Sequence, residues 1–148
     1  MDLAELRLQE QVIILITRNF RFLFEECGYI DNSFYIGVGE TSVSYTNNSI
    51  KRQVRIIWEY MGYFYVGVHK IRWQNIFGRK DPKFYAMYTY DLYDEFKYQN
   101  LHEILNESNM QELITRHAQF IKDYLMPVIK GEMWFDELIK EHRAGLNR

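Results

Sequence analysis

The first part of the chain repeats apolar residues with the period of an α-helix. The repeat runs through Leu8, Val12, Leu15, Ile16, Phe20 and Leu23, and positions three or four apart share one helix face. Asp2 followed by Glu5 has the form of a capping box, which favours a helix start at this point. Gly28 predicts the helix end, because glycine readily adopts the positive φ that follows a last helical turn. Further apolar positions predict a helix buried on most sides, namely Ile13, Ile14, Phe22 and Phe24.

From Tyr29 onward apolar residues recur at every second position, which is typical of β-strands with one buried face. Phe34, Ile36 and Val38 share one face of a first strand, and Thr41, Val43 and Tyr45 form a second strand. The positions expected to be buried are Val54, Ile56 and Trp58 in the third strand and Phe64, Val66 and Val68 in the fourth. Residues 74–83 are expected to form a loop, because they contain Gly78 and Pro82. Residues 84–90 are expected to form a fifth strand. Short turns between successive strands indicate an antiparallel meander with one solvated or partner-facing side.

The last third of the chain returns to helical periodicity. Residues 91–98 are expected to form a short helix, and Ser108 with Gln111 has the form of a second capping box. Pro127 should bend or end the helix that follows, because it lacks a backbone donor, and Gly131 separates that helix from a final one. The apolar stripe of the longer helix runs through Leu113, Ile114, His117, Ile121, Tyr124, Leu125 and Val128.

The order of these elements predicts an α+β fold. It combines an N-terminal helix, an antiparallel meander sheet of about five strands, and C-terminal helices packed on one sheet face. A length of 148 residues fits a single domain spanning residues 1–148. The aromatic fraction is high, at 17%, with 12 Tyr, 10 Phe and 3 Trp. Tyrosine and phenylalanine favour strands, and tyrosine is also common at interaction surfaces.

Charge, cysteine content and targeting signals narrow the function classes. The formal net charge of −2 indicates neither a strongly basic nucleic-acid-binding protein nor a strongly acidic DNA mimic. The single Cys27 excludes an internal disulfide and a structural cysteine cluster. The longest aliphatic run, Val12 to Ile16, is too short to span a membrane, and the N-terminus lacks the basic region of a signal peptide. We therefore expect a cytoplasmic protein with no membrane partner.

The residue types that carry catalysis or bind metals do not form a known motif. The histidines at 69, 102, 117 and 142 include no pair at i, i+4, and His102-Glu103 is followed by Asn106 where a zinc-protease motif has its second histidine. No Gly-x-Ser-x-Gly elbow is present, and Asp91, Asp94 and Glu95 fit a helix start. We therefore predict no catalytic, metal or cofactor site and a protein that is not an enzyme. An enzyme with residues scattered along the chain is a further alternative.

Two surfaces are candidates for recognition. The outward sheet face and the 74–83 loop combine aromatic and basic groups of the kind that dominate protein interfaces. The alternative is a nucleic-acid-binding accessory protein that uses the basic and aromatic residues around 72–83, because phosphate attraction and base stacking need these types together. The residues expected to bind a partner are Arg55, Ile57, Tyr63, Tyr65, His69, Arg72, Trp73, Phe77, Arg79 and Lys80.

The order of several short segments resembles a known group of proteins. The segments are Phe20-x-x-Leu23 leading to Gly28-Tyr29, Val43-Ser44-Tyr45-x-Asn47, Val54-x-Ile56, Phe64-x-Val66-x-Val68 and, late in the chain, Val128-Ile129-Lys130-Gly131-Glu132. This order resembles small uncharacterised bacterial α+β families, several of them regarded as immunity proteins of polymorphic toxin systems. The resemblance implies a non-enzymatic protein that binds and neutralises a cognate toxin. The weak net charge departs from the strongly acidic immunity proteins that oppose nuclease toxins, which leaves the toxin's chemistry open.

Overall fold

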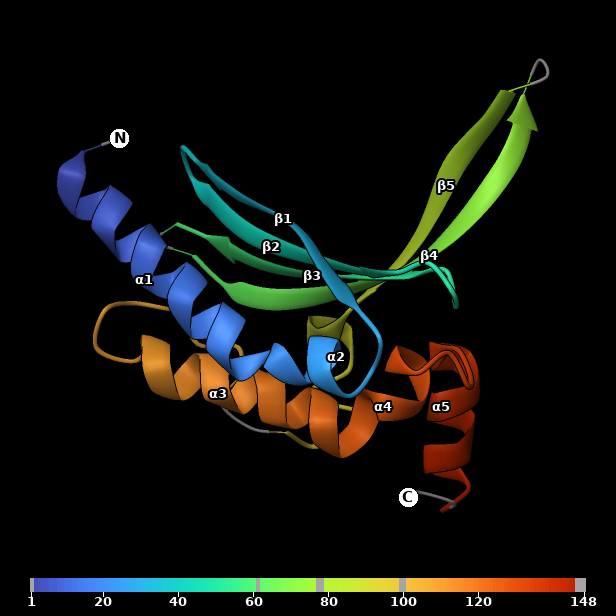
Figure 1. The fold of residues 1–148 in the computed structure, drawn as a ribbon. Coiled ribbons are helices and arrows are strands. Elements are labelled where there is room, and N and C mark those ends of the chain that lie inside the picture. The colour runs from blue at the N-terminus through green and yellow to red at the C-terminus, as the bar shows by residue number, and fades with distance from the viewer. Residues whose placement is uncertain (1, 61, 77–78, 99–100, 146–148) are drawn as a thin grey trace.

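The computed structural model describes residues 2–60, 62–76, 79–98 and 101–145, with side chains described outside 31–32 and 72–85. The fold begins with two helices, continues through five strands, and ends with helical segments (Figure 1). The elements are α1 (Leu3–Asn19), α2 (Arg21–Glu25), β1 (Ile30–Gly37), β2 (Glu40–Asn47), β3 (Arg52–Glu59), β4 (Phe64–Ile76), β5 (Arg79–Tyr88), η1 (Thr89–Asp91), α3 (Met110–Phe120), η2 (Ile121–Leu125), α4 (Met126–Ile129) and α5 (Phe135–Arg143).

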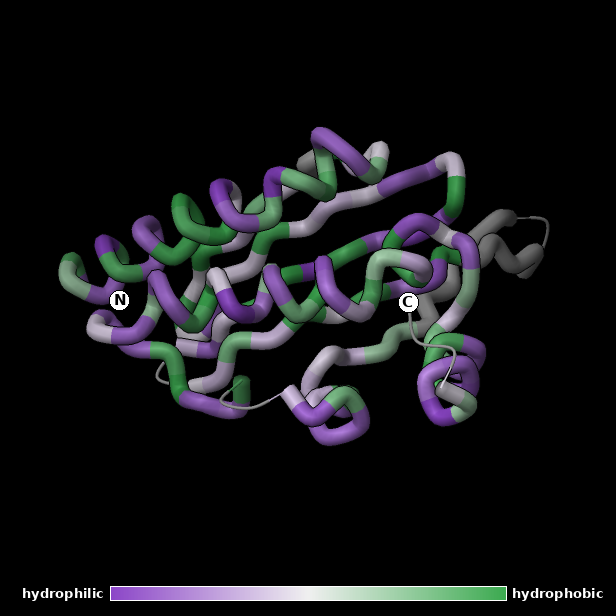
Figure 2. The backbone as a smooth tube through the Cα atoms, turned by 90° about the horizontal axis from the view of Figure 1, so that it is seen from below, coloured by the Kyte–Doolittle hydropathy of each residue, from purple (hydrophilic) through white to green (hydrophobic). Residues whose placement is uncertain are grey.

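The strands form one antiparallel sheet in the order β1-β2-β3-β4-β5, as the meander predicts. The helices lie on one face of this sheet (Figure 1), and Figure 2, seen from that side, shows the helical layer in front of the strands. The sheet curves upward at both ends, with α1 following it at one end and the β4–β5 hairpin leaving the helical layer at the other, so the helix-free face is concave (Figure 1). The α+β fold predicted from the sequence is therefore confirmed.

The sheet face under the helices carries the main part of the core. Val43, Ile56 and Val66 are direct register partners on three neighbouring strands, and each is at most 1% exposed. This confirms the buried face predicted for the third and fourth strands. All of the positions predicted to be buried are buried, namely Val54, Ile56, Trp58, Phe64, Val66 and Val68. On β2, Thr41, Val43 and Tyr45 are buried as well.

The edge strand β1 ends at Gly37, before the predicted strand residue Val38, and it is less buried than the central strands. Phe34 is 65% exposed, and Val38 lies in the turn after the strand and is 83% exposed. The register between β1 and β2 also shifts between Asp31 and Ser33, which marks a β-bulge or irregularity. An edge strand has a neighbour on one side only, so alternation alone does not ensure burial there.

The N-terminal helix starts as predicted and ends earlier than predicted. The Asp2 side chain accepts a hydrogen bond from the Glu5 backbone N–H at 2.8 Å. The helix stops at Asn19, whose side chain donates to the Leu15 carbonyl oxygen at 2.8 Å. Asparagine competes in this way with the helical backbone pattern, and α2 follows as a separate short helix. The helix pair is also less buried than predicted, since Ile14 is 57% and Phe24 is 61% exposed.

The loop predicted for residues 74–83 is wrong. β4 continues to Ile76 and β5 begins at Arg79, so these residues belong to a long hairpin that extends beyond the rest of the sheet (Figure 1). Pro82 pairs with Trp73 in the register of this hairpin. Proline is tolerated here because β5 is an edge strand, where a missing N–H need not break a ladder on both sides.

The helical segments of the C-terminal region begin at other residues than predicted. Residues 91–98 contain the end of the 3-10 helix η1 and a series of turns in place of an α-helix. The residue before α3 is Asn109 and not the predicted Ser108, and its side chain makes no capping hydrogen bond. In the turn before the helix the Asn106 side chain accepts from the Ser108 N–H at 3.0 Å and the Asn109 N–H at 3.2 Å. Pro127 lies in the first turn of α4, after the π-helical segment η2, in agreement with the predicted break.

We expect Ile56→Ala to lower the free energy of unfolding by about 2–4 kcal/mol, because it opens a cavity in the fully buried face. Arg55→Ala, on the other face of the same strand, should cost less than about 1 kcal/mol, since its ion pair with Glu40 is partly exposed. Urea unfolding followed by circular dichroism measures both values. A larger loss for Arg55→Ala than for Ile56→Ala would contradict the assignment of the two sheet faces.

Candidate functional site

The helix-free face of the sheet carries a cluster of tyrosine rings, here called the tyrosine cluster and consisting of Tyr65, Tyr88 and Tyr90. Tyr65 makes edge contacts with both other rings, at centroid distances of 5.7 Å to Tyr88 and 5.4 Å to Tyr90. The rings of Tyr88 and Tyr90 are stacked at 5.4 Å with an interplanar angle of 3°. Such aromatic pairs hold their members in a defined geometry beyond simple burial. The cluster is therefore a preorganised aromatic surface.

Backbone geometry positions this cluster. Tyr88 is the register partner of Gly67, and a Cβ at Gly67 would lie 3.0 Å from the Tyr88 ring. The missing side chain of Gly67 therefore leaves room for the Tyr88 ring. Tyr90 belongs to η1, directly after β5, and is thereby carried to the side of Tyr65 on β4.

Carboxylates border the cluster. The Tyr65 hydroxyl donates to Glu59 Oε1 at 3.1 Å, and Arg55 Nη2 lies 3.1 Å from Glu40 Oε1. The pKa of Tyr65 is raised because burial disfavours the phenolate and the Glu59 carboxylate adds to this effect. The pKa of Tyr90 is raised by burial and then by Asp91. The open face thus combines aromatic rings with negative charge.

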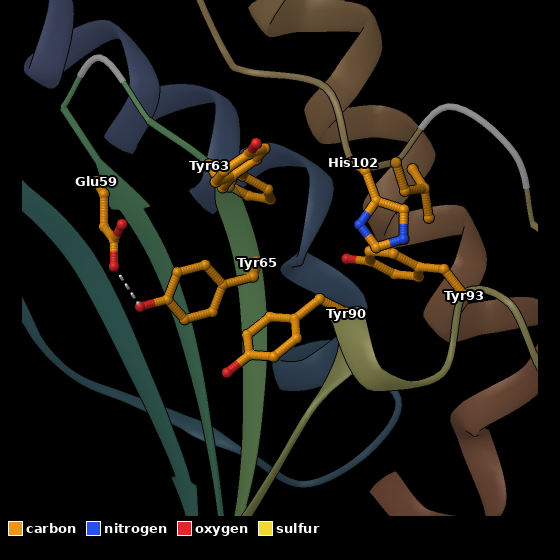
Figure 3. Close-up of a pocket in the computed structure, with 8 residues that line it drawn as sticks. Glu59, Tyr63, Tyr65, Tyr90, Tyr93 and His102 are labelled. Carbon is orange, nitrogen blue, oxygen red and sulfur yellow. Dashed lines mark hydrogen bonds between the residues drawn. The ribbon is translucent and has the colours of Figure 1, made fainter.

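A pocket of about 340 Å³ opens beside the cluster (Figure 3). We call it the tyrosine pocket, and its lining residues are Glu59, Tyr63, Phe64, Tyr65, Tyr90, Tyr93, Leu101 and His102. Figure 3 shows Tyr65 and Tyr90 next to each other, with Tyr93 and His102 together on another side. The backbone of Tyr63 forms an isolated β-bridge with Ile104, which joins the start of β4 to the segment before α3. Four separate parts of the chain therefore build one hollow.

The predicted partner-binding residues fall into three groups. Tyr63, Tyr65 and Arg55 lie outside the helical layer, with Tyr63 52% exposed and the other two half-buried. Ile57 and His69 were predicted to be exposed, and this is wrong, since they are 4% and 9% exposed. Ile57 lies between its register partners Ser42 and Tyr65, and the His69 ring contacts Tyr88 at 6.2 Å. Each of the two side chains therefore has a tyrosine neighbour on the sheet.

The third group lies on the β4–β5 hairpin. The side chains of Arg72, Trp73, Arg79 and Lys80 lie outside the described residues, as does the whole of Phe77. The backbone places the first two in β4 and the second two in β5. The predicted basic and aromatic patch at this position is therefore neither supported nor contradicted.

Sequence patterns missed Tyr88, Tyr90 and Glu59 as members of the site. Tyr88 and Tyr90 were expected in a fifth strand, with no face assigned to either. The alternation of the two tyrosines with Thr89 does indicate which residues face the core. Thr89 is 1% exposed, whereas Tyr90 is 43% exposed. Alternation gives no signal for Glu59, because its place in the site depends on the hydrogen bond that it accepts from the Tyr65 hydroxyl.

A buried chain of polar groups lies behind the pocket. Thr89 Oγ1 accepts from the Val66 backbone N–H at 3.1 Å and shares a hydrogen bond of 3.0 Å with the Tyr93 hydroxyl. The Tyr93 hydroxyl also lies 3.0 Å from His117 Nδ1. The pKa of His117 is lowered to about 3, because burial disfavours the imidazolium, with the Leu101 backbone opposing and His102 adding to the effect. His117 is therefore neutral at pH 7 and serves as a structural anchor.

The described residues offer neither a metal site nor an activated thiol. Within the described ranges no group of three or more His, Cys, Asp or Glu side chains is placed to hold a metal ion. Cys27 is buried, and burial raises the pKa of its thiol. Among the described helices none has the length and apolar character needed to cross a membrane.

Comparison with known proteins adds no relative. No protein-family model matches the chain, and neither a curated protein nor a solved structure does. The resemblance to immunity-protein families therefore stays a prediction based on the order of short segments. Inferences about function rest on the geometry of this chain.

We expect stability to fall as the pH drops below the ordinary histidine pKa of 6.5 toward the folded-state value of His117, about 3. The fold lowers this pKa, so the unfolded chain binds the proton more tightly, and the loss reaches at most about 1.4 kcal/mol per pH unit. Urea unfolding between pH 7.5 and 4.5 measures the slope.

In His117→Gln the slope should be flatter, although absolute stability also changes because the contact with Tyr93 is altered. Gln111→Ala, at an exposed position on the same helix, is the control and should keep the wild-type slope, since it removes no titratable group. A residual slope is expected from His69, whose pKa is also lowered by burial. An unchanged slope in His117→Gln would contradict the role assigned to this histidine.

Proposed function

We propose that the protein binds another protein on its helix-free sheet face, without catalysing a reaction. The observation that carries this proposal is the tyrosine cluster, together with Tyr63, on a face that the described helices leave open (Figure 1). Tyr63 and Tyr90 are 52% and 43% exposed, although both contain large apolar rings. Burial of these rings against a partner would be favourable by the hydrophobic effect.

The composition of the face supports protein recognition. Tyrosine and arginine are enriched among the residues that contribute most to binding free energy. A tyrosine ring has only two side-chain torsions, so ordering it on binding costs little conformational entropy. Here the ring contacts with Tyr65 order Tyr88 and Tyr90 in advance.

The shape of the face supports a convex partner. The sheet is concave on its open side, and the β4–β5 hairpin projects beyond it (Figure 1). The predicted immunity function is one form of this proposal, in which the bound partner is a toxin that loses its activity on binding. The nucleic-acid alternative depends on hairpin side chains outside the described residues, and the experiment below includes it as an outcome.

The test uses the tagged protein in extracts of its source cells, followed by affinity measurement with the purified partner. Tyr65→Ala combined with Tyr90→Ala should weaken binding at least about tenfold, because two preorganised rings are removed from the interface. Gln111→Ala, at an exposed position of α3 on the helical side, is the matched control and should change the affinity by less than about twofold. Thermal melts check that both variants fold.

A larger loss of affinity in Gln111→Ala than in the double tyrosine variant would overturn the proposal. Captured nucleic acid that is released steeply by added salt would favour the alternative function. For the immunity form, expression of the identified partner alone should arrest growth, and co-expression with the wild-type chain should restore it. Restoration by the double variant to the same extent would contradict neutralisation through this face.

A further inference from the structure

The tyrosine pocket has the chemical character of a site for a cation. Its walls include the rings of Tyr63, Tyr65 and Tyr90, and its border carries the Glu59 carboxylate (Figure 3). The faces of aromatic rings attract cations through their quadrupole, and a nearby carboxylate adds direct charge attraction. No described lining residue is a lysine or an arginine.

The Glu59 carboxylate is available to such a cation. It accepts a hydrogen bond from Tyr65 and makes no ion pair with a described residue. Arg55, which lies on the same strand, is already paired with Glu40. A carboxylate has about four acceptor positions, so the Tyr65 contact leaves capacity for a charged donor.

The surroundings of the pocket favour positive charge over negative charge. The pKa values of Tyr65 and Tyr90 are raised by burial and by nearby carboxylates, Glu59 for the first and Asp91 for the second. The same carboxylates that disfavour a phenolate would stabilise a cation placed among the rings. An anionic ligand would meet the opposite effect.

We infer that the tyrosine pocket receives the guanidinium or ammonium end of an arginine or lysine side chain from the partner protein. This inference rests on the proposed function and names the partner group that the open face recognises. A hollow of about 340 Å³ holds one side-chain end and leaves the rest of the partner to contact the tyrosine cluster. The cation lies among the rings, and Glu59 accepts its outward-facing N–H groups.

The test uses short capped peptides as probes. Acetyl-Gly-Arg-Gly-amide and its lysine counterpart are titrated into the folded chain, and the ring signals of Tyr65 and Tyr90 are followed by NMR. The control peptide contains citrulline, which keeps the shape of arginine and lacks its charge. We expect saturable shifts with the cationic peptides, with arginine and lysine compared directly, and an affinity for citrulline at least about fivefold lower.

Two variants test whether the arginine peptide binds in the tyrosine pocket. Glu59→Gln keeps an acceptor for the Tyr65 hydroxyl and removes the charge. It should therefore lower the affinity for the arginine peptide about fivefold and leave the melting temperature unchanged. Glu103→Gln removes an exposed carboxylate outside the pocket lining and is the matched control. Equal binding of citrulline and arginine, an unaffected Glu59→Gln variant, or no saturable shift would overturn the inference.

Failure of this inference can be distinguished from failure of the proposed function. If the captured partner still depends on Tyr65 and Tyr90 while Glu59→Gln has wild-type affinity for it, the sheet face binds the partner without a cation in the pocket. If the affinity of the partner is also unchanged by the tyrosine substitutions, the proposed function itself is wrong.

Discussion

The fold depends on the packing of one sheet face against the helices. Val43, Ile56 and Val66 form a continuous buried row across β2, β3 and β4, and the helical layer covers this row. Because strand side chains alternate between faces, the same packing fixes which side chains point away from the helices. The open face is thus determined by the core on the other side. A shift of one residue in the register would exchange the two surfaces.

The buried polar chain extends this constraint to the candidate site. Thr89 binds the β4 backbone at Val66, and Tyr93 links Thr89 to His117 on α3. Tyr90 lies between Thr89 and Tyr93 in the sequence, so both ends of its segment are held to the core. The Tyr90 ring at the surface is thereby ordered by the buried hydrogen bonds of Thr89 and Tyr93. Ordering of this kind reduces the entropy lost when a partner binds.

The sequence predicted the fold class and the central strands, and predicted the site only in part. The alternation of apolar residues correctly predicted that Ile56 and Val66 are buried, because strands with neighbours on both sides bury one face almost completely. It failed for Ile57, which alternation places on the open face and which is nevertheless only 4% exposed. The tyrosine pocket combines residues from β3, β4, η1 and the segment before α3. Contacts between such distant segments have no periodic signature.

The outermost strand β1 has a consequence for solution behaviour. Ile30 and Phe34 expose 51% and 65% of their surface along an edge that has a described strand neighbour on one side only, at β2. Exposed apolar edges invite pairing between chains and aggregation. The irregular register between Asp31 and Ser33 interrupts this edge, and an interrupted edge is a poor template for an incoming strand. The irregularity therefore leaves a shorter regular stretch of β1 on which a strand of another chain could pair.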